Sequence, residues 1–252
     1  MKKKSTEKGE SYALSVNSKL AGLDFSRAMV WASKIYATFK QYEIGLCSNL
    51  VFRRLKKILL EVYATNDTHL IGSKKLFGAD VSLLKKWRIH NYRPWNEYLD
   101  FKMLLRVVPA NGEVVLALGQ LVLEQGKLTS RACAAAMRFY LLFMDEDMDT
   151  SSSVALEELV VPVGGEQEAL EASFTFEPMG NGVFLLLGAC QLHLLDKNGG
   201  GSFVSHDKNY YWANIMEAVA IKEGVVVNYE KKTVLPKEGK KVTRVGWVKR
   251  KG

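Results

Sequence analysis

The sequence lacks the features that would place it in several specialised classes of protein. It has only five prolines in 252 residues, and 48% of its residues are apolar and 25% charged, which is typical of a globular chain of one or two domains. No uninterrupted apolar run approaches about 18 residues, so we expect no membrane-spanning helix. The N-terminus, MKKKSTEKGES, is not followed by an apolar stretch, so we expect no secretory signal.

Cysteine is scarce as well. The three cysteines, Cys47, Cys133 and Cys190, are odd in number and far apart, which argues against a disulfide framework and against a CxxC zinc module. We therefore expect a reducing compartment, the cytosol or the nucleus. His193 follows Cys190 by three residues, a spacing that puts the two side chains on opposite faces of a strand and argues against a thiolate–imidazole pair.

The familiar catalytic and nucleotide-binding motifs are also missing. The sequence contains no GxxxxGKS/T phosphate loop, no GxGxxG after a strand, no GxSxG and no HExxH. The glycines at 199–201 lack the lysine and the helix that a phosphate cradle needs, and the acidic run 145–149 lacks the glycine and the distant glutamate of a calcium loop. We therefore expect a solvated acidic turn at 145–149 and a protein that is not an enzyme and holds no metal or cofactor. An enzyme with an unrecognised site stays an open alternative.

Charge is distributed unevenly along the chain. The net charge is +8 over residues 1–60, +1 over 61–100, −8 over 101–221 and +7 over 222–252. No lysine or arginine lies between Arg138 and Lys197, where many acidic residues fall. Basic ends suit anionic partners such as nucleic acid or acidic lipid, and an acidic middle suits self-association. A solvated charged surface without a partner is the alternative.

Helical patterns dominate the first part of the chain. Residues 1–20 are polar and rich in lysine and are expected to form a mobile arm. Residues 24–42 predict a helix capped by Asp24 or Ser26. Residues 43–64 predict a second, amphipathic helix with its apolar residues on one face and Arg53, Lys56 and Lys57 on other faces.

From about residue 98 the apolar pattern switches to a period of two. We predict strands at 98–108, 113–124, 140–144, 172–178 and 182–195, with turns at 109–112 and 180–182 and an acidic loop region with one strand at 151–170. We predict a short alanine-rich helix at 130–139 and a longer helix at 209–224, with Asp207 as its N-cap and Gly224 as its stop. Residues 225–232 and 244–251 are expected to form short strands or a basic tail.

Strands and helices are segregated along the chain instead of alternating, which predicts an α+β fold and not a doubly wound sheet. The expected parts are a basic arm at 1–20, a helical part at 21–95, a small antiparallel-sheet body at 96–235 with a packed helix near its end, and a basic tail at 236–252.

Two basic features are candidate binding sites. The first combines the N-terminal arm with the predicted helix 43–64, where contacts to anionic lipid or RNA are expected at Lys2, Lys3, Lys4, Lys8, Arg53, Arg54, Lys56 and Lys57. The alternative for the helix is a core helix with a wet basic face.

The second basic feature is the C-terminal tail, in which Pro236, Gly239 and Gly246 disfavour a helix. An extended basic segment suits the acidic pockets of a nuclear import receptor. The expected nuclear localisation residues are Lys240, Lys241, Lys249, Arg250 and Lys251. The spacing of the two clusters is shorter than that of the usual bipartite signal. Nucleic-acid or lipid binding and an inert solvated tail remain alternatives.

The order of these patterns resembles the matrix proteins of rhabdoviruses. The resemblance rests on FKMLLRV, from Phe101 to Val107, and on the closing unit from Asn209 to Lys232, a predicted helix followed by a glycine, a valine-rich strand and two lysines. It covers roughly residues 95–235, and the added basic C-terminus is similar to that of plant rhabdoviruses that mature in the nucleus. No proline precedes Pro94, so the proline-rich budding motif of many animal-virus members is missing.

The resemblance implies a structural protein that lines the inner face of a viral envelope, self-associates and condenses the nucleocapsid for budding. It implies four partners: the viral nucleoprotein, an anionic membrane surface, a host nuclear import receptor and other copies of the chain. It also implies location in the virion, the host nucleus and nuclear membrane, and the host cytoplasm. The alternative is a viral nucleic-acid-binding accessory protein of the movement or silencing-suppressor type.

Overall fold

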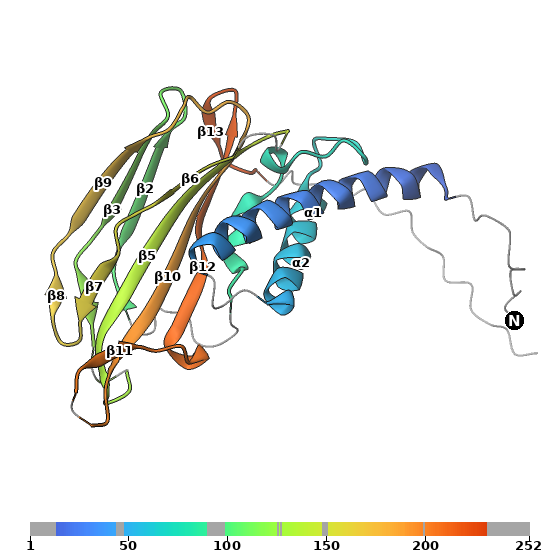
Figure 1. Cartoon of the computed structure of the whole chain (residues 1–252). Helices are drawn as coiled ribbons and strands as arrows, with labels where there is room; N and C mark the ends of the chain where they lie inside the picture. The colour runs from blue at the N-terminus through green and yellow to red at the C-terminus, as the bar shows by residue number, and fades with distance from the viewer. Residues whose placement is uncertain are drawn as a thin grey trace, which may run out of the picture.

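The computed structural model describes residues 14–43, 48–89, 99–124, 126, 128–147, 151–198 and 200–230. Two long helices and two short 3₁₀ helices come first along the chain, and antiparallel strands follow (Figure 1). Helices account for 29% and strands for 41% of the structure, which confirms the coarse prediction of mixed helices and antiparallel sheets in an α+β fold. Within the described residues, no helix combines the length and apolar character needed to cross a bilayer.

The helices are α1 (Val16–Tyr42), α2 (Asn49–Thr65), η2 (Leu76–Gly78), η3 (Val81–Lys86) and η6 (Lys208–Tyr210). The strands are β1 (Leu99–Asp100), β2 (Met103–Val108), β3 (Glu113–Leu118), β4 (Leu121–Leu123), β5 (Ala132–Asp145), β6 (Ser151–Ala155), β7 (Leu159–Pro162), β8 (Glu166–Gln167), β9 (Leu170–Thr175), β10 (Gly182–Leu195), β11 (Ser202–Val204), β12 (Tyr211–Lys222) and β13 (Val225–Val227).

These strands form one large and two small sheets. The large sheet has the order β13-β12-β10-β5, with β6 and β7 both on the far side of β5 and β11 paired to the end of β10. The small sheets have the orders β2-β3-β9 and β1-β4-β8. One face of the large sheet packs against the small sheets, and the helices cover its other face (Figure 1).

Strand β10, in the middle of the large sheet, is a nearly continuous apolar run in the sequence. Val183, Leu185 and Leu187 belong to the core shared with the helices, whereas Phe184 and Leu186 belong to the core between the sheets. All five side chains are fully buried. A strand buried on both faces has no polar face, so the alternation disappears from the sequence.

The helix predicted at 130–139 is wrong, because residues 132–139 form the first part of β5. They pair with β10, and Ala135 lies opposite Leu192. Alanine favours helices by only a fraction of a kcal/mol per residue, and pairing inside a buried sheet outweighs that preference.

The helix predicted at 209–224 is also wrong, because the chain forms η6 and then β12. Tyr211 faces the helices and Trp212 faces the sheet sandwich, so both sides of this strand are buried. Its pairing with β10 is irregular where Leu186 lies opposite Glu217 and Leu187 opposite Ile215. Met216 is thus an extra residue in β12. It interrupts the alternation of side chains between the two faces of the strand, so the apolar spacing in the sequence resembles that of a helix.

The predicted ends of that helix have other functions. Asp207 accepts a hydrogen bond from the Asn209 amide at 2.9 Å and caps the short η6 instead of a long helix. Glu223 and Gly224 have φ of 52° and 73°, and they form the two-residue turn between β12 and β13. This turn needs a positive φ at both positions, which explains the glycine.

The other predicted elements are recovered with different boundaries. The predicted strand regions at 98–108, 113–124, 140–144, 172–178 and 182–195 contain β1 to β4, part of β5, part of β9, and β10. The acidic region 151–170 contains three strands, β6 to β8, and the start of β9, where one strand was expected. Helix α1 begins at Val16, inside the predicted arm, and Ser15 caps it by accepting from the Ser18 amide at 3.2 Å.

Candidate functional site

Helix α1 extends beyond the rest of the fold. Its 27 residues span about 40 Å. Trp31, Ile35 and Phe39 are buried in the core against the large sheet, whereas the N-terminal end of the helix projects past the body (Figure 1). The helix therefore offers a long surface that no other described element covers.

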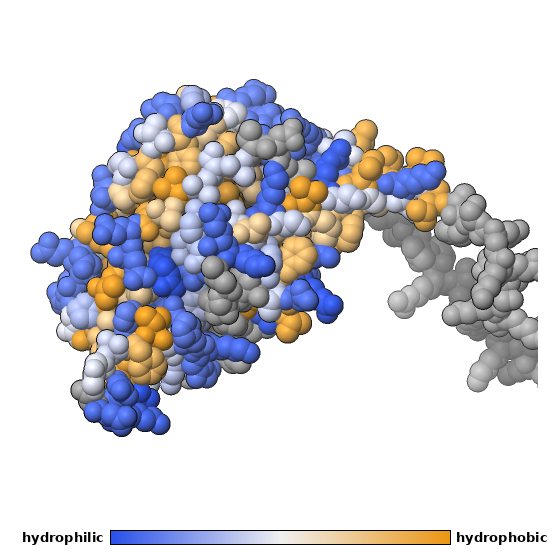
Figure 2. Space-filling view, in the orientation of Figure 1, coloured by the Kyte–Doolittle hydropathy of each residue, from blue (hydrophilic) through white to orange (hydrophobic). Residues whose placement is uncertain are grey.

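The uncovered side of α1 carries an apolar residue every two turns. Val16, Leu23, Val30 and Ala37 recur every seven residues, which places them along one side of the helix. The first three are 72%, 51% and 42% exposed, and Ala37 is exposed as well. Figure 2 shows apolar side chains gathered on the projecting end of the helix beside hydrophilic ones.

Basic residues lie among and beside these apolar residues, since Lys19 follows Val16 by three positions and Lys34 follows Val30 by four. Lys19 and Lys40 are exposed and Lys34 is half-buried. We call the four apolar residues together with these three lysines the α1 outer face. The one acidic residue in α1 is Asp24, and it is buried. An exposed apolar stripe flanked by cations, with no exposed carboxylate on the helix, is the chemistry of an in-plane helix on an anionic bilayer.

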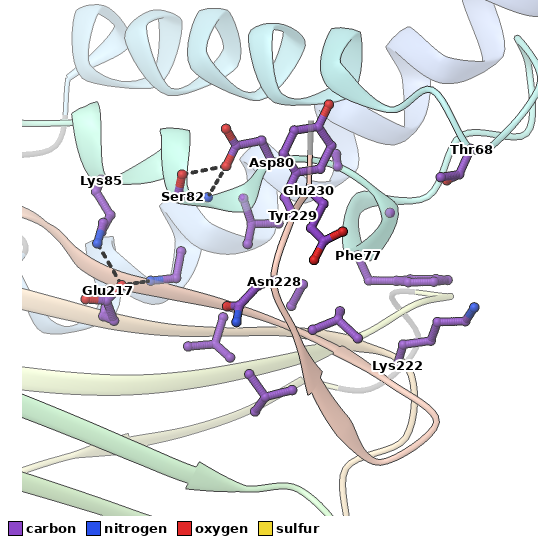
Figure 3. A pocket seen from close by; sticks show the side chains of 18 of the residues that line it. Thr68, Phe77, Asp80, Ser82, Lys85, Glu217, Lys222, Asn228, Tyr229 and Glu230 are labelled. Carbon is purple, nitrogen blue, oxygen red and sulfur yellow. Dashed lines mark hydrogen bonds and ion pairs between the residues drawn. The ribbon is translucent and has the colours of Figure 1, made fainter. Parts of the chain in front are cut away.

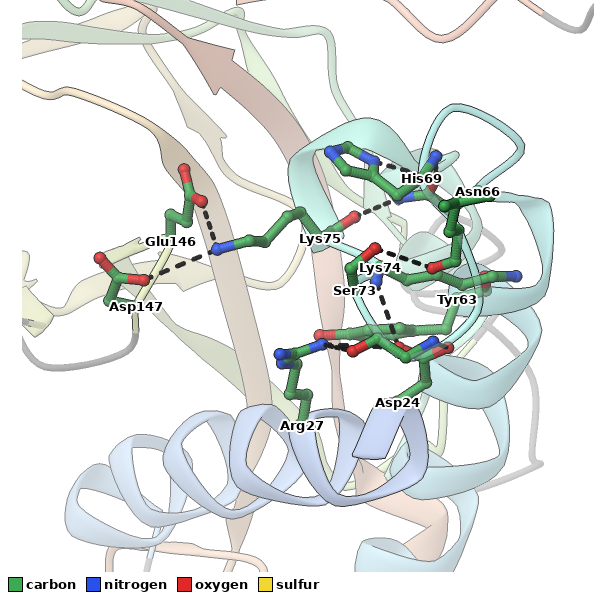
Figure 4. Close-up of polar contacts among 12 residues, drawn as sticks. Asp24, Arg27, Tyr63, Asn66, His69, Ser73, Lys74, Lys75, Glu146 and Asp147 are labelled. Carbon is green, nitrogen blue, oxygen red and sulfur yellow. Dashed lines mark hydrogen bonds and ion pairs between the residues drawn. The ribbon is translucent and has the colours of Figure 1, made fainter. Parts of the chain in front are cut away.

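Asp24 holds a loop against α1 and does not cap the helix. Its carboxylate accepts hydrogen bonds from the backbone amides of Gly72 at 2.8 Å and Lys74 at 3.1 Å (Figure 4). Arg27 donates to the Gly72 carbonyl at 2.6 Å from the next turn of the helix. The predicted capping by Asp24 is therefore wrong, because the helix starts eight residues earlier.

The acidic run at 145–149 is partly neutralised where the structure describes it. Lys75 forms ion pairs with Glu146 and, at 3.6 Å, with Asp147 (Figure 4). The bond from Lys75 lowers the pKa of Glu146 below its usual value. The predicted solvated turn is therefore also tied, through Glu146 and Asp147, to the loop before η2.

The four basic residues predicted on α2 differ in how they are used. Arg54 donates to the Ile89 carbonyl at 2.7 Å, so it supports the fold. Lys56 lies over the rings of Phe52 and Phe25, with its Nζ 5.5 and 6.0 Å from the ring centres. Arg53 is exposed, and Lys57 has an 80% exposed side chain at 4.0 Å from Glu61. Arg53 and Lys57 are therefore the members of this set most open to a partner.

The remaining predicted site residues are not placed. Lys2, Lys3, Lys4 and Lys8 of the arm lie outside the described residues. The tail residues Lys240, Lys241, Lys249, Arg250 and Lys251 also lie outside them. The structure therefore brings together none of the predicted lipid-binding or nuclear localisation sets as a whole.

A buried polar network fixes the other end of α1. The carboxylate of Glu43, which follows the last turn, accepts from Arg138 Nε at 2.7 Å and Nη2 at 3.1 Å, and from the hydroxyls of Tyr140 and Tyr211. Burial, with the nearby Glu43 carboxylate, raises the pKa of both tyrosines above the ordinary range. Sequence reasoning missed this network because its members lie 95 to 168 residues from Glu43.

The described residues offer little reactive chemistry. They contain no group of three or more His, Cys, Asp or Glu side chains placed to hold a metal ion. Burial raises the pKa of the Cys190 thiol to about 12, so this cysteine is protonated near neutral pH and is a poor nucleophile. The α1 outer face is thus the surface with the clearest chemical character. The apolar residues at 16, 23, 30 and 37 recur every seven positions in the sequence, but the predicted helix began at residue 24 and so left out the first two.

Comparisons with known proteins add no functional information. No protein-family model matches the chain, and no curated protein matches it. Among solved structures, it is similar to a superoxide reductase (neelaredoxin) from Ignicoccus hospitalis, with 11% identity over 48% of this chain and 78% of the other, and a TM-score of 0.21.

Two further similar structures show equally limited agreement. The sporulation control protein Spo0M from Bacillus subtilis has 11% identity over 45% of this chain and 49% of the other, with a TM-score of 0.20. A β-galactosidase described as putative, from Bacteroides fragilis, has 9% identity over 43% and 15%, with a TM-score of 0.21. Similarities at this level support no argument about fold or function.

Proposed function

We propose that the chain is a non-enzymatic structural protein that attaches to the inner, anionic face of an enveloping membrane, as a viral matrix protein does. The observation that carries this proposal is the α1 outer face. Val16, Leu23 and Val30 are available to enter the boundary between headgroups and acyl chains, and Lys19, Lys34 and Lys40 are placed beside them for acidic headgroups.

The magnitude of this attraction suits reversible attachment. Each cation near an anionic bilayer contributes about 1 kcal/mol, so the three lysines contribute about 3 kcal/mol before any apolar burial is counted. Arg53 and Lys57 add to this total where α2 also approaches the bilayer. The protein would then bind and leave the membrane as salt, lipid composition and self-association change.

The proposal depends more on this surface than on the resemblance. The piece from Phe101 to Val107 falls largely in β2, as expected for a strand. The closing piece from Asn209 to Lys232 contains the strand β12 in place of its helix. Self-association, nucleoprotein contact and nuclear entry remain parts of the same proposal, supported by the basic ends and acidic middle of the sequence.

Vesicle co-sedimentation of the full chain tests the proposal directly. Vesicles of phosphatidylcholine alone are compared with vesicles that also contain phosphatidylserine, at about 0.1 M and about 1 M salt. We expect binding that requires phosphatidylserine and weakens in high salt. The double substitution of Leu23→Ser and Val30→Ser should abolish most of it.

The matched control is Leu195→Ser with Phe203→Ser. These two side chains are 48% and 46% exposed and lie on β10 and β11, far from the projecting end of α1 (Figure 1). Equal loss of binding in both double variants would remove the α1 outer face as the site. Absence of lipid binding together with steeply salt-dependent RNA binding would favour the nucleic-acid accessory protein instead.

A further inference from the structure

A groove of about 810 Å³ opens where the edge of the large sheet, the edge of a small sheet and the 3₁₀ helices meet (Figure 3). Phe77 comes from η2, Met103 and Leu104 from β2, and Val226 from β13. These side chains give the groove an apolar wall on each of its three sides. The groove is only partly enclosed, which suits an extended segment better than a fully enclosed small molecule.

One wall of the groove is an unpaired strand edge. Strand β2 is the outer strand of its sheet and pairs with β3 alone among the described strands. Leu104, in the middle of the part that lines the groove, is 68% exposed. An outer strand with unpaired backbone groups and an exposed leucine is a template for one more strand.

The rim of the groove is acidic. Asp67, Asp80 and Glu230 line it, and Glu217 is neutralised by Lys85 at 2.9 Å. Lys222 is the other basic residue of the lining. The rim therefore favours a segment that carries positive charge on either side of apolar residues.

The chain itself supplies such a segment, and it starts at the groove. Val226 to Glu230 line the wall, and the Tyr229 hydroxyl donates to the Thr65 carbonyl at 3.0 Å, which anchors this stretch to the end of α2. The residues that follow, 231–252, lie outside the described residues. Their sequence contains nine basic residues and one acidic residue.

Within that sequence, KVTRVGWVK at 241–249 has the pattern of a strand between basic clusters. Thr243, Val245 and Trp247 alternate with Arg244 and Gly246, so the apolar valine and tryptophan share one face. The ten residues at 231–240 include a proline and a glycine and span at most about 35 Å, which is enough for the chain to turn back into the groove.

We propose that the groove is the docking site of the chain's own residues 242–248, which add to the free edge of β2 as a strand. Val245 and Trp247 face the apolar wall, and the flanking lysines face Asp67, Asp80 and Glu230. Docking also covers the predicted nuclear localisation residues on both sides of the strand. The groove then competes with an import receptor for the same segment, and this competition is independent of lipid binding.

Hydrogen exchange of the full chain tests the docking. We expect the amides of β2 to exchange about tenfold more slowly in the natural chain than in the variant Val245→Asp, because strand addition protects the free edge. The matched control is Val242→Asp, which makes the same change of size and charge on the solvent face of the docked strand. It should keep most of the protection and the same circular dichroism.

The outcomes separate the possible occupants. Protection that is independent of protein concentration supports docking within one chain, whereas protection that appears only at high concentration assigns the groove to a second copy and overturns the proposal. Equal exchange of β2 in all three proteins also overturns it. Equal loss of protection in both variants overturns it too, because Val245 and Val242 would then not lie on opposite faces of a docked strand. The Val245→Asp variant should in addition bind an import receptor more tightly than the Val242→Asp variant.

Discussion

The guanidinium of Arg138 on β5 lies against the carboxylate of Glu43 at the end of α1, with Nε 2.7 Å from Oε1. Their side chains are 19% and 5% exposed, so the pair is largely removed from water. It joins the helix layer to the large sheet across 95 residues of sequence. The position of α1, and with it the α1 outer face, depends on this buried pair.

Replacing Glu43 by alanine should therefore strongly destabilise the fold. The change leaves the Arg138 guanidinium partly unpaired and removes the acceptor of two tyrosine hydroxyls. We expect the free energy of unfolding to fall by about 3 to 5 kcal/mol, measured by urea unfolding. Glu158 is a matched control, because it pairs with the same guanidinium at 2.9 Å but its side chain is 44% exposed. Glu158→Ala should cost less than about 1 kcal/mol, and equal losses would contradict the account.

The same network predicts a loss of stability at alkaline pH. Burial and the Glu43 carboxylate raise the pKa of Tyr140 and Tyr211 in the folded state. In the unfolded chain tyrosine loses its proton near pH 10, so above about pH 10 the unfolded state binds fewer protons than the folded state. The free energy of unfolding should fall as the pH rises beyond this value. In the variant Tyr211→Phe the free energy of unfolding should fall less steeply with rising pH than in the natural chain. The same steepness in both proteins would exclude Tyr211 as a cause.

Asp24 should stabilise the loop at 72–74, which packs against α1 beside this residue. Asp24→Ala removes the acceptor of two backbone amides, those of Gly72 and Lys74, and should lower the free energy of unfolding by about 1 to 3 kcal/mol. Ser26 is exposed on the same helix, and Ser26→Ala should change the free energy by less than about 0.5 kcal/mol. A loss of equal size at Ser26 would restore the interpretation of this stretch as a helix cap.

Lipid binding should depend more on the cations of α1 than on those of α2. The double substitution of Lys19 and Lys34 by glutamine removes about 2 kcal/mol of attraction, which weakens binding to anionic vesicles about 30-fold. Arg53→Gln with Lys57→Gln makes the same change of charge on α2. We expect a smaller effect there, because Lys57 lies beside Glu61 and the large apolar side chains that the described helix α2 exposes are Leu50 and Leu60. If the α2 double variant loses more vesicle binding than the α1 double variant, α2 and not α1 carries the membrane-facing surface.

The sequence determined the local structure of several elements that have one face in water. The amphipathic helix α2, strand β2 and the turn at Pro109–Gly112 follow from spacing and from turn chemistry, because α2 and β2 each bury one face and leave a period in the sequence. Gly112 illustrates this, since it adopts φ of 71° in that turn, as glycine does at little cost. The uneven distribution of charge is likewise a property of the sequence alone.

Tertiary structure decided the elements that are buried on both sides, and it decided which side chains remain free. Strands β5 and β12 lie between two cores, so their apolar pattern carries no period and local propensity points to helices. Arg54 and Lys56 look like equivalent surface cations in the sequence, but packing gives them the Ile89 carbonyl and two phenylalanine rings. The network around Glu43 and the exposure of the α1 outer face arise only when segments far apart in the chain meet, because no local interaction specifies them.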